Sequence, residues 1–216
     1  MSRVSPRHID PKLGENLIEA AAKLLAEEGP QALSTRRLAA AVGTSTMAVY
    51  TRFGGKEDLV RAMVREGFQL LDQEMTAVHE TADPVCDVVA LGWAYRRNAL
   101  EHRNLYGVMF GGPGLGGFAL TDEDRQHGRY TLSSVVRAVE RCMEAKRFHA
   151  GDAQLVAHQL WIALHGLVTL ELGGYLIPPY DADTCYEAQI SALLVGAGED
   201  PAEAAAVMKR ARDRRD

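Results

Sequence analysis

Helical periodicity is the sequence feature that most constrains this fold. Along nearly all of the 216 residues, apolar side chains recur every three or four positions, as on the buried face of a helix. Alternating β-branched runs bounded by turn residues, which would indicate strands, are missing from the sequence. Three Asp-Pro pairs mark helix starts, because Asp caps free N–H groups and Pro fits the first helical position. These pairs are Asp10-Pro11, Asp83-Pro84 and Asp200-Pro201. The sequence therefore predicts an all-α fold.

Glycine and proline divide this pattern into about nine helices and a C-terminal tail helix. The expected helices cover residues 10–28, 35–42, 45–52, 56–80, 84–102, 103–110, 121–148, 152–176 and 181–195, and the tail helix begins near residue 200. The stretch GGPGLGG at residues 111–117 lacks the Lys-Ser/Thr of a phosphate loop and does not follow a strand. We expect it to be an entry loop or a linker.

The segment from Leu33 to Lys56 predicts a DNA-binding motif. Leu38, Ala39 and Val42 on its first short helix can bury against Val49 on its second. Gly43 between them allows a backbone reversal in which a Cβ atom would be costly. Two helices joined by a tight glycine-containing turn form a helix-turn-helix.

The second short helix leaves a face that fits the major groove of DNA. That face carries hydroxyl groups, which can reach base edges, and an apolar group, which can contact a thymine methyl. Its residues are Thr46, Met47, Tyr50 and Thr51. Positive charges flank the face and can contact phosphates. They belong to Arg36, Arg37, Arg52 and Lys56.

This pattern resembles the DNA-binding domain of the TetR family of transcriptional repressors over residues 11–60. The residues that carry the resemblance are Thr35, Leu38, Ala39, Gly43, the Tyr50-x-x-Phe53 pair, Lys56 and Leu59. The resemblance implies that Tyr50 and Lys56 bind operator phosphates and that Phe53 is a core aromatic. It also implies a base-contacting surface formed by Thr44, Ser45, Thr46, Met47 and Thr51. With Thr35, Arg36 and Arg52, these residues complete the predicted DNA site.

A second resemblance lies in the run from Leu160 to Gly166. Its sequence LWIALHG is similar to the Trp-His-Gly motif of one TetR C-terminal subfamily. The resemblance implies an all-helical C-terminal region that binds an inducer and forms a homodimer. We expect a four-helix bundle from the helices near 152–176 and 181–196 of each subunit. The expected stripes are Leu155, Gln159, Ile162, Gly166, Thr169 and Gly173 on one helix and Ile190, Leu193, Leu194 and Ala197 on the other.

The middle of the chain supplies candidates for an effector site. Ligand sites in helical proteins lie between helices and are mostly apolar with a few polar groups. We therefore expect an apolar or aromatic small-molecule effector, and core packing is the alternative role of each residue. The candidates are Phe68, Leu71, Met75, Trp93, Tyr106, Met109, Phe110, Tyr130, Trp161 and His165. His158 and His165 share a helix face, but no thiol or carboxylate completes a metal set, so we expect no metal and no cofactor.

The net charge of −5 divides unevenly along the chain. Residues 1–65 carry ten Lys and Arg against seven Asp and Glu, a charge of +3, and the remainder carries 14 against 22, a charge of −8. Such a basic end suggests a surface that faces DNA or a membrane. The apolar runs are short and interrupted, the N-terminus lacks a secretory signal, and three distant cysteines indicate reduced thiols. We expect a cytoplasmic protein without a membrane partner.

Taken together, these features predict a ligand-responsive repressor. Residues 10–56 would bind a pseudo-palindromic double-stranded operator, residues 57–200 would bind the effector and dimerise, and residues 201–216 would form a basic tail helix. A cytosolic enzyme is one alternative, but no nucleophile–base trio or paired-carboxylate motif supports it. A helical interaction protein that has lost DNA binding is the other, and the presence of Tyr50 and Lys56 opposes it.

Overall fold

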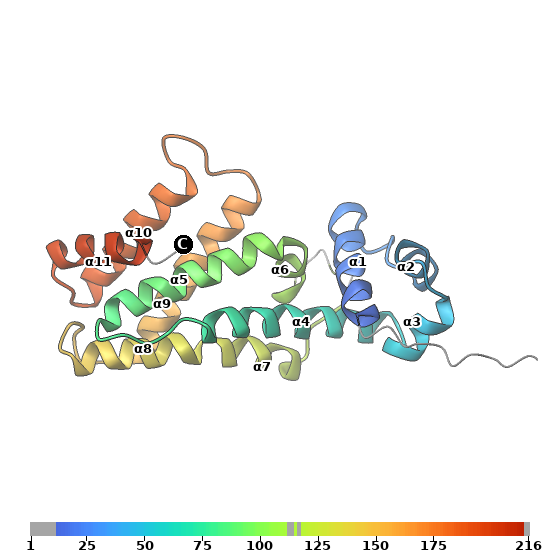
Figure 1. Cartoon of the computed structure of the whole chain (residues 1–216), viewed down its shortest axis with the longest axis horizontal. Coiled ribbons are helices and arrows are strands. Elements are labelled where there is room, and N and C mark those ends of the chain that lie inside the picture. The colour runs from blue at the N-terminus through green and yellow to red at the C-terminus, as the bar shows by residue number, and fades with distance from the viewer. Residues whose placement is uncertain (1–11, 112–114, 116–117, 214–216) are drawn as a thin grey trace, which may run out of the picture. The chain divides into compact units, whose positions relative to one another are not determined.

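The fold is described from a computed structural model that covers residues 12–111, 115 and 118–213 (Figure 1). The described residues form helices and no strand, which confirms the all-α prediction. The helix start expected at Asp10-Pro11, most of the 111–117 loop and the last three residues of the tail lie outside the described ranges. Contacts between Cα atoms group the chain into two compact units, which are described separately below.

The first unit comprises residues up to Gly67 and residues 104–125. Its helices are α1 (Leu13–Glu28), α2 (Thr35–Val42), α3 (Thr46–Phe53), the first half of α4 (Lys56–Thr76) and nearly all of α6 (Arg103–Met109). Leu17, Ala21 and Leu38 are completely buried and form the centre of its core. The unit therefore extends beyond residue 56, where the sequence places the end of the DNA-binding domain.

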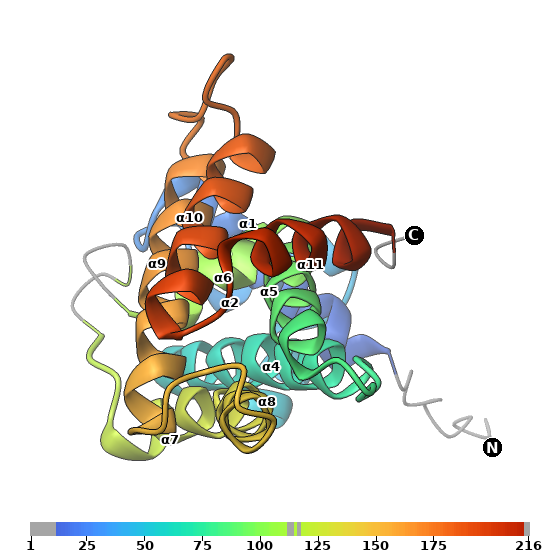
Figure 2. The ribbon, with the colours of Figure 1, turned by 90° about the vertical axis from the view of Figure 1, so that its left-hand side faces the viewer.

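The second unit comprises residues 68–103 and 126–216. It contains α5 (Pro84–Glu101), most of α7 (Asp122–Thr131), α8 (Ser133–Glu144), α9 (Ala153–Leu172), α10 (Ala182–Ala197) and α11 (Pro201–Asp213). Figure 2 shows α5 near the middle of this unit, and α5 contacts α8, α9 and α11. Most of its residues are buried, including Val85, Val89 and Ala99.

Aspartate caps begin several of these helices. Asp83 accepts a hydrogen bond from the backbone N–H of Cys86, and Asp200 accepts bonds from the N–H groups of Ala202 and Glu203. Both Asp-Pro starts within the described residues are thereby confirmed. Such a cap satisfies backbone donors that the first helical turn leaves free.

The helix expected over 121–148 is two helices, α7 and α8, that meet at Leu132. Hydroxyl groups on both sides of the junction bond to the backbone: Thr131 Oγ1 donates to the carbonyl of Gly128, and Ser133 Oγ donates to that of Tyr130. Side-chain hydroxyls that compete for helix carbonyls in this way bend or interrupt helices. The spacing of apolar residues, from which the single helix was predicted, does not reveal this competition.

α9 is long and apolar enough to cross a bilayer, judged by length and composition alone. The sequence analysis did not expect any such segment. One side of α9 packs against α8 and α10 through buried residues such as Ala157, Leu164 and Val168. Because the core helix of a water-soluble protein passes the same test, this helix is weak evidence for a membrane span.

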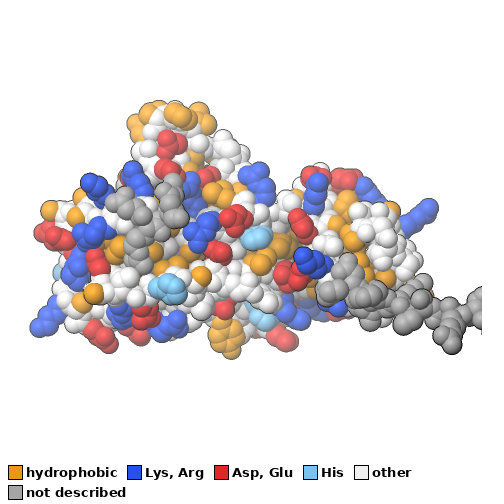
Figure 3. All heavy atoms as spheres, viewed as in Figure 1, with side chains coloured by type: hydrophobic (Ala, Val, Ile, Leu, Met, Phe, Trp, Pro, Cys, Tyr) orange, Lys and Arg blue, Asp and Glu red, His pale blue; other side chains and the backbone are white. Residues whose placement is uncertain are grey.

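The connection from α9 to α10, residues 173–180, carries exposed aromatic and aliphatic side chains. We call it the α9–α10 segment. Hydrophobic side chains gather at its position at the top of Figure 3. Tyr175, Ile177 and Tyr180 are 76%, 67% and 72% exposed.

Candidate nucleic-acid interface

The packing of α2 against α3 fixes the orientation of α3. Leu38 and Ala39 on α2 are buried, and Val49 on α3 is 1% exposed, as the sequence predicted. Gly43 ends α2 in the left-handed region at φ 70°, where its N–H bonds to carbonyls of α2. The Ser45 hydroxyl then accepts a hydrogen bond from the N–H of Ala48 and caps α3.

The outer face of α3 is open to solvent. Met47 is 69% exposed and Tyr50 is 52% exposed, although side chains of their size are usually more buried. Thr46 and Thr51 on the same face are also exposed. Thr51 Oγ1 donates a hydrogen bond to the carbonyl of Met47 at 2.8 Å, so this hydroxyl keeps its lone pairs available as acceptors.

Lys56 begins α4 and ties it to the turn after α1. Its exposed Nζ donates a hydrogen bond to the backbone carbonyl of Pro30 at 2.7 Å. An ammonium group has three donors, so two remain for a phosphate. The contact holds the amine at the first turn of α4, where free backbone N–H groups also favour an anion.

The arginines near this face differ in their surroundings. Arg37 forms an ion pair with Glu28, with two N–O distances of 2.6 and 2.8 Å. Arg36 is exposed and forms no ion pair with another residue in the described part of the chain. Thr35 at the start of α2 and Thr44 in the turn between α2 and α3 are half-buried.

Arg52 occupies the other side of α3. Its guanidinium lies so close to Gly14 of α1 that a Cβ atom at position 14 would overlap it. Arg52 also lines a groove of about 360 Å³ with Arg61 and Arg65 of α4. Arg52 is itself exposed, and its contact with DNA stays a prediction. Phe53 on the same side is half-buried.

Two family models match this chain. The one described as bacterial regulatory proteins of the tetR family matches residues 17–63, which include all of α2 and α3. The one described as a tetracyclin repressor-like C-terminal domain matches residues 88–193. The chain belongs to the TetR family of transcriptional regulators. Members of this family are regulators and not enzymes.

Individual relatives agree with this membership. An uncharacterized HTH-type transcriptional regulator of Mycobacterium tuberculosis is 26% identical over 185 residues, covering 84% of this chain and 80% of the relative. A protein of unknown function from Rhodococcus sp. RHA1 has a solved structure with a TM-score of 0.74 and 26% identity, covering 90% of this chain and all of that one. The TetR family regulator PfmR from Thermus thermophilus shares the fold, with a TM-score of 0.67, 24% identity, and coverage of 83% and 97%.

The predicted effector residues of this TetR regulator lie in both units. Tyr106, Met109 and Phe110 belong to the first unit, where the rings of Tyr106 and Phe110 meet edge to face at 5.4 Å. The others belong to the second unit, in which Phe68, Leu71, Met75 and Trp93 are buried and Trp161 and His165 are half-buried. Tyr130 is 63% exposed, because it lies on the solvent side of α7, and so lines no interior space within its unit.

His165 contributes polar contacts among the effector candidates of the second unit. Its Nδ1 lies 3.1 Å from the hydroxyl of Tyr95 on α5, and its ring lies 5.9 Å from that of Trp161. Burial lowers the pKa of His165 below its usual value. Asn98, one turn after Tyr95, is also buried, and its Nδ2 has no hydrogen-bond partner in the described part of the chain. The sequence did not single out Asn98, because it directly follows Arg96 and Arg97 and reads as part of a polar stretch.

The second residue cluster that the sequence analysis missed centres on Arg96. Its guanidinium donates two hydrogen bonds of 2.7 Å to Glu171 at the end of α9 and one of 2.5 Å to Asp183 at the start of α10. Burial disfavours the charged form of Arg96, but the two carboxylates outweigh this effect and raise its pKa. No group of three potential metal ligands occurs among the described residues.

The two predicted dimer stripes have different outcomes. On α9, Leu155, Ile162 and Thr169 are exposed, as expected of a surface that awaits a partner. On α10, Ile190 and Leu194 are instead buried in the unit's own core, so this part of the stripe was wrong. α10 is apolar nearly all round, and a pattern of that kind does not tell which face points inward. The exposed α10 residues are smaller and include Ala188, Ala192, Val195 and Gly196.

Proposed function

We propose that this TetR-family regulator is a homodimeric repressor that a small molecule releases from its operator. The observation that carries the proposal is the exposed face of α3, with Met47 and Tyr50 outward while Val49 holds the helix from behind. Large side chains that are exposed on a well-packed helix indicate a contact surface for another macromolecule. A recognition helix of this kind lies in the major groove.

Each polar group of the motif has a proposed role. Thr46 and Thr51 present hydroxyls to base edges, Met47 offers an apolar contact to a thymine methyl, and Thr44 and Ser45 approach the groove at the N-terminus of α3. Phosphates flanking the groove are bound by the Tyr50 hydroxyl, Lys56 Nζ, the Arg36 guanidinium and the Thr35 hydroxyl. A net charge of +3 in residues 1–65 becomes +6 in a dimer and favours the encounter with DNA.

Dimerisation is proposed to occur through α9 and α10. The exposed apolar residues of α9 follow one face at spacings of three and four, and Gly166 and Gly173 on that face allow close approach. The exposed α10 residues, Ala188, Ala192 and Gly196, are equally small. A two-fold dimer presents two α3 helices to half-sites one or more helical turns apart on a pseudo-palindromic operator.

The effector is proposed to be an apolar or aromatic molecule with at least one polar group. The aromatic and aliphatic candidates of the second unit supply the apolar contacts, and Tyr95, Asn98 and His165 of the same unit supply hydrogen bonds. α4 is one continuous helix from Lys56 to Thr76, so it joins a DNA-facing residue to Leu71 and Met75. A ligand that binds one orientation of α4 more tightly than the other would shift the spacing of the α3 helices.

A binding selection tests the proposal. The purified protein is incubated with random double-stranded DNA, the bound fraction is sequenced, and affinity for the selected site is measured by fluorescence anisotropy at several salt concentrations. We expect a pseudo-palindromic site bound at least about a thousandfold more tightly than random DNA. Equal affinity for all sequences would overturn the DNA-binding part. Effector release is tested by adding compounds that raise the melting temperature.

A further inference from the structure

The α9–α10 segment exposes more apolar surface than a connection between helices normally does. Residues 173–180 read GGYLIPPY and contain no charged side chain. Tyr175, Ile177 and Tyr180 are each more than two-thirds exposed, and the segment projects from the second unit (Figures 1 and 3). Contiguous exposed apolar patches on water-soluble proteins mark interaction sites.

The base of this segment is held in place. Arg96 of α5 bonds to Glu171 at its entrance and to Asp183 just beyond its exit, so one guanidinium joins both ends. Asp181 caps α10 by accepting a hydrogen bond from the N–H of Thr184. At the entrance, the Tyr175 ring packs against Gly173 so closely that a Cβ atom there would overlap it. A segment fixed at its base loses less conformational entropy when a partner covers it.

The surface continues from the segment onto α9. Leu170, Ile162 and Leu155 are 46%, 63% and 57% exposed and extend back along that helix. Ile162 and Leu155 belong to the proposed dimer face, and Leu170 is next to Thr169 of that face in the chain. A dimer interface that includes the exposed face of α9 therefore extends onto the α9–α10 segment.

We propose that the α9–α10 segment is an arm that packs against the second copy of this chain in the dimer, a proposal that rests on the dimer of the proposed function. Two aromatic rings and an isoleucine cover several hundred Å² per subunit, against about 800 Å² per partner in a standard interface. A lipid surface fits less well, because the three carboxylates beside the segment, those of Glu171, Asp181 and Asp183, outnumber the one guanidinium, that of Arg96, and anionic lipids repel the excess negative charge.

Dissociation measurements test the arm. The double variant Tyr175→Ser with Ile177→Ser is compared with the wild type by sedimentation velocity over a dilution series. Because two-fold symmetry places each substitution in both copies, we expect the dimer dissociation constant to rise at least about 100-fold. Tyr130→Ser is the control, since it removes another exposed tyrosine, at 63% against 76% for Tyr175, from α7 and should leave the constant unchanged. Circular dichroism verifies that each variant is folded.

A cross-linking experiment identifies what the arm contacts. A photoreactive benzoylphenylalanine at position 175 should give a covalent dimer on illumination, and the same group at position 130 should not. A wild type that is monomeric at all concentrations would overturn the proposed dimer and the arm with it. A wild-type dimer that the arm variants leave intact, with no cross-link from position 175, would overturn the arm alone. Binding to phosphatidylglycerol vesicles that the arm variants abolish would show a membrane contact and also overturn it.

Discussion

The guanidinium of Arg96 holds the carboxylate of Glu171 through two parallel hydrogen bonds of 2.7 Å. The two side chains are 10% and 18% exposed, so little solvent screens the pair. Arg97, the next residue of α5, forms a more exposed ion pair with Glu74 of α4. Arg96 is more buried than Arg97 and bonds a second carboxylate, that of Asp183, so the two neighbours compare a buried cluster with a surface pair.

Replacing Arg96 should destabilise the protein far more than replacing Arg97. Arg96→Ala leaves Glu171 partly buried without its partner, and we expect a loss of about 3 kcal/mol in the free energy of unfolding. Arg97→Ala should cost less than about 1 kcal/mol, as surface pairs do. Urea denaturation at one fixed protein concentration measures both values. Equal losses would mean that burial does not decide the strength of the Arg96 pair.

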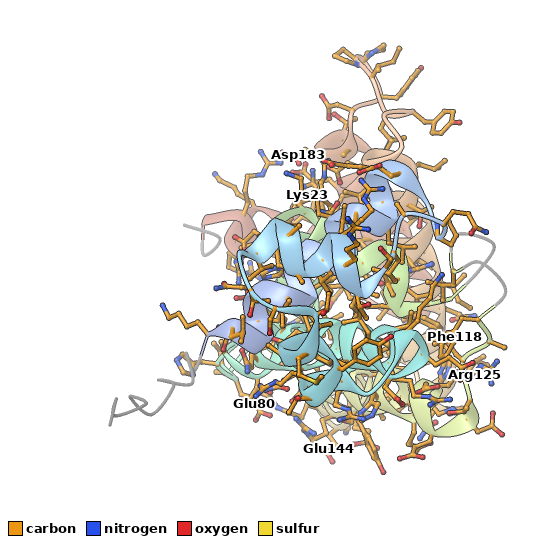
Figure 4. All side chains as sticks on the ribbon, turned by 90° about the vertical axis from the view of Figure 1, so that its right-hand side faces the viewer. Lys23, Glu80, Phe118, Arg125, Glu144 and Asp183 are labelled. Carbon is orange, nitrogen blue, oxygen red and sulfur yellow. The ribbon has the colours of Figure 1, made fainter. Side chains whose placement is uncertain are left out.

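Substitutions at Tyr50 and Lys56 should weaken operator binding by different routes. Lys56→Ala removes a phosphate contact and should reduce the slope of log affinity against log salt by about one. Tyr50→Phe removes only a neutral hydroxyl and should lower affinity without changing that slope. Lys23→Ala is the control, because this exposed lysine of α1 (Figure 4) pairs with Glu27 and belongs to no predicted DNA contact. A slope that Lys56→Ala leaves unaltered would argue against a phosphate contact at Lys56.

Gly92 should not tolerate a larger residue. A Cβ atom there would overlap the hydroxyl of Tyr186, which is completely buried and donates a 2.9 Å hydrogen bond to the carbonyl of Val89. Gly92→Ala should therefore cost about 1–3 kcal/mol. Gly107→Ala is the matched helical control with no atom within 4 Å, and it should gain up to about 1 kcal/mol. Thermal unfolding in which Gly92→Ala matches the wild type would contradict the packing at Tyr186.

His165 should make stability depend on pH below neutrality. Burial lowers its pKa in the folded protein, so the unfolded chain binds a proton first as the pH falls through about 6.5. The stability that the buried, neutral His165 side chain contributes is constant above that pH and is lost progressively as the pH falls below it. His165→Gln should reduce the drop in unfolding free energy between pH 7 and pH 5, by at most about 1.4 kcal/mol per pH unit. Tyr95→Phe is the control, because it keeps the imidazole buried and should retain the pH dependence. Identical profiles of unfolding free energy against pH for the wild type and His165→Gln would contradict this assignment.

The sequence predicted best where local chemistry decides the structure. Asp83 and Asp200 cap their helices and Gly43 ends α2, because each outcome depends on a few adjacent residues. The exposed face of α3 could also be predicted from adjacent residues, because burial of Val49 turns Met47 and Tyr50 toward solvent.

Predictions from the sequence were wrong or incomplete where contacts between residues far apart in the chain determine the structure. Ile190 and Leu194 belong to the core rather than to the expected dimer face, because the packing of α10 against α9 and α11 selects the buried side. The Arg96 cluster joins residues 75 and 87 positions apart, and no local pattern links them. The approach of the Arg52 guanidinium to Gly14 likewise joins residues that are 38 positions apart, and the sequence of α3 alone does not reveal it.

α3 keeps only one of its eight residues, Val49, fully buried. Its position depends on that side chain, on the Ser45 cap and on the turn at Gly43. Substitutions at Thr46, Met47 and Thr51 therefore leave the fold almost untouched while they alter what the helix presents. If these residues contact bases, as we propose, related proteins can acquire new operators by changing these positions alone, and a library randomised there would retain folded, selectable members.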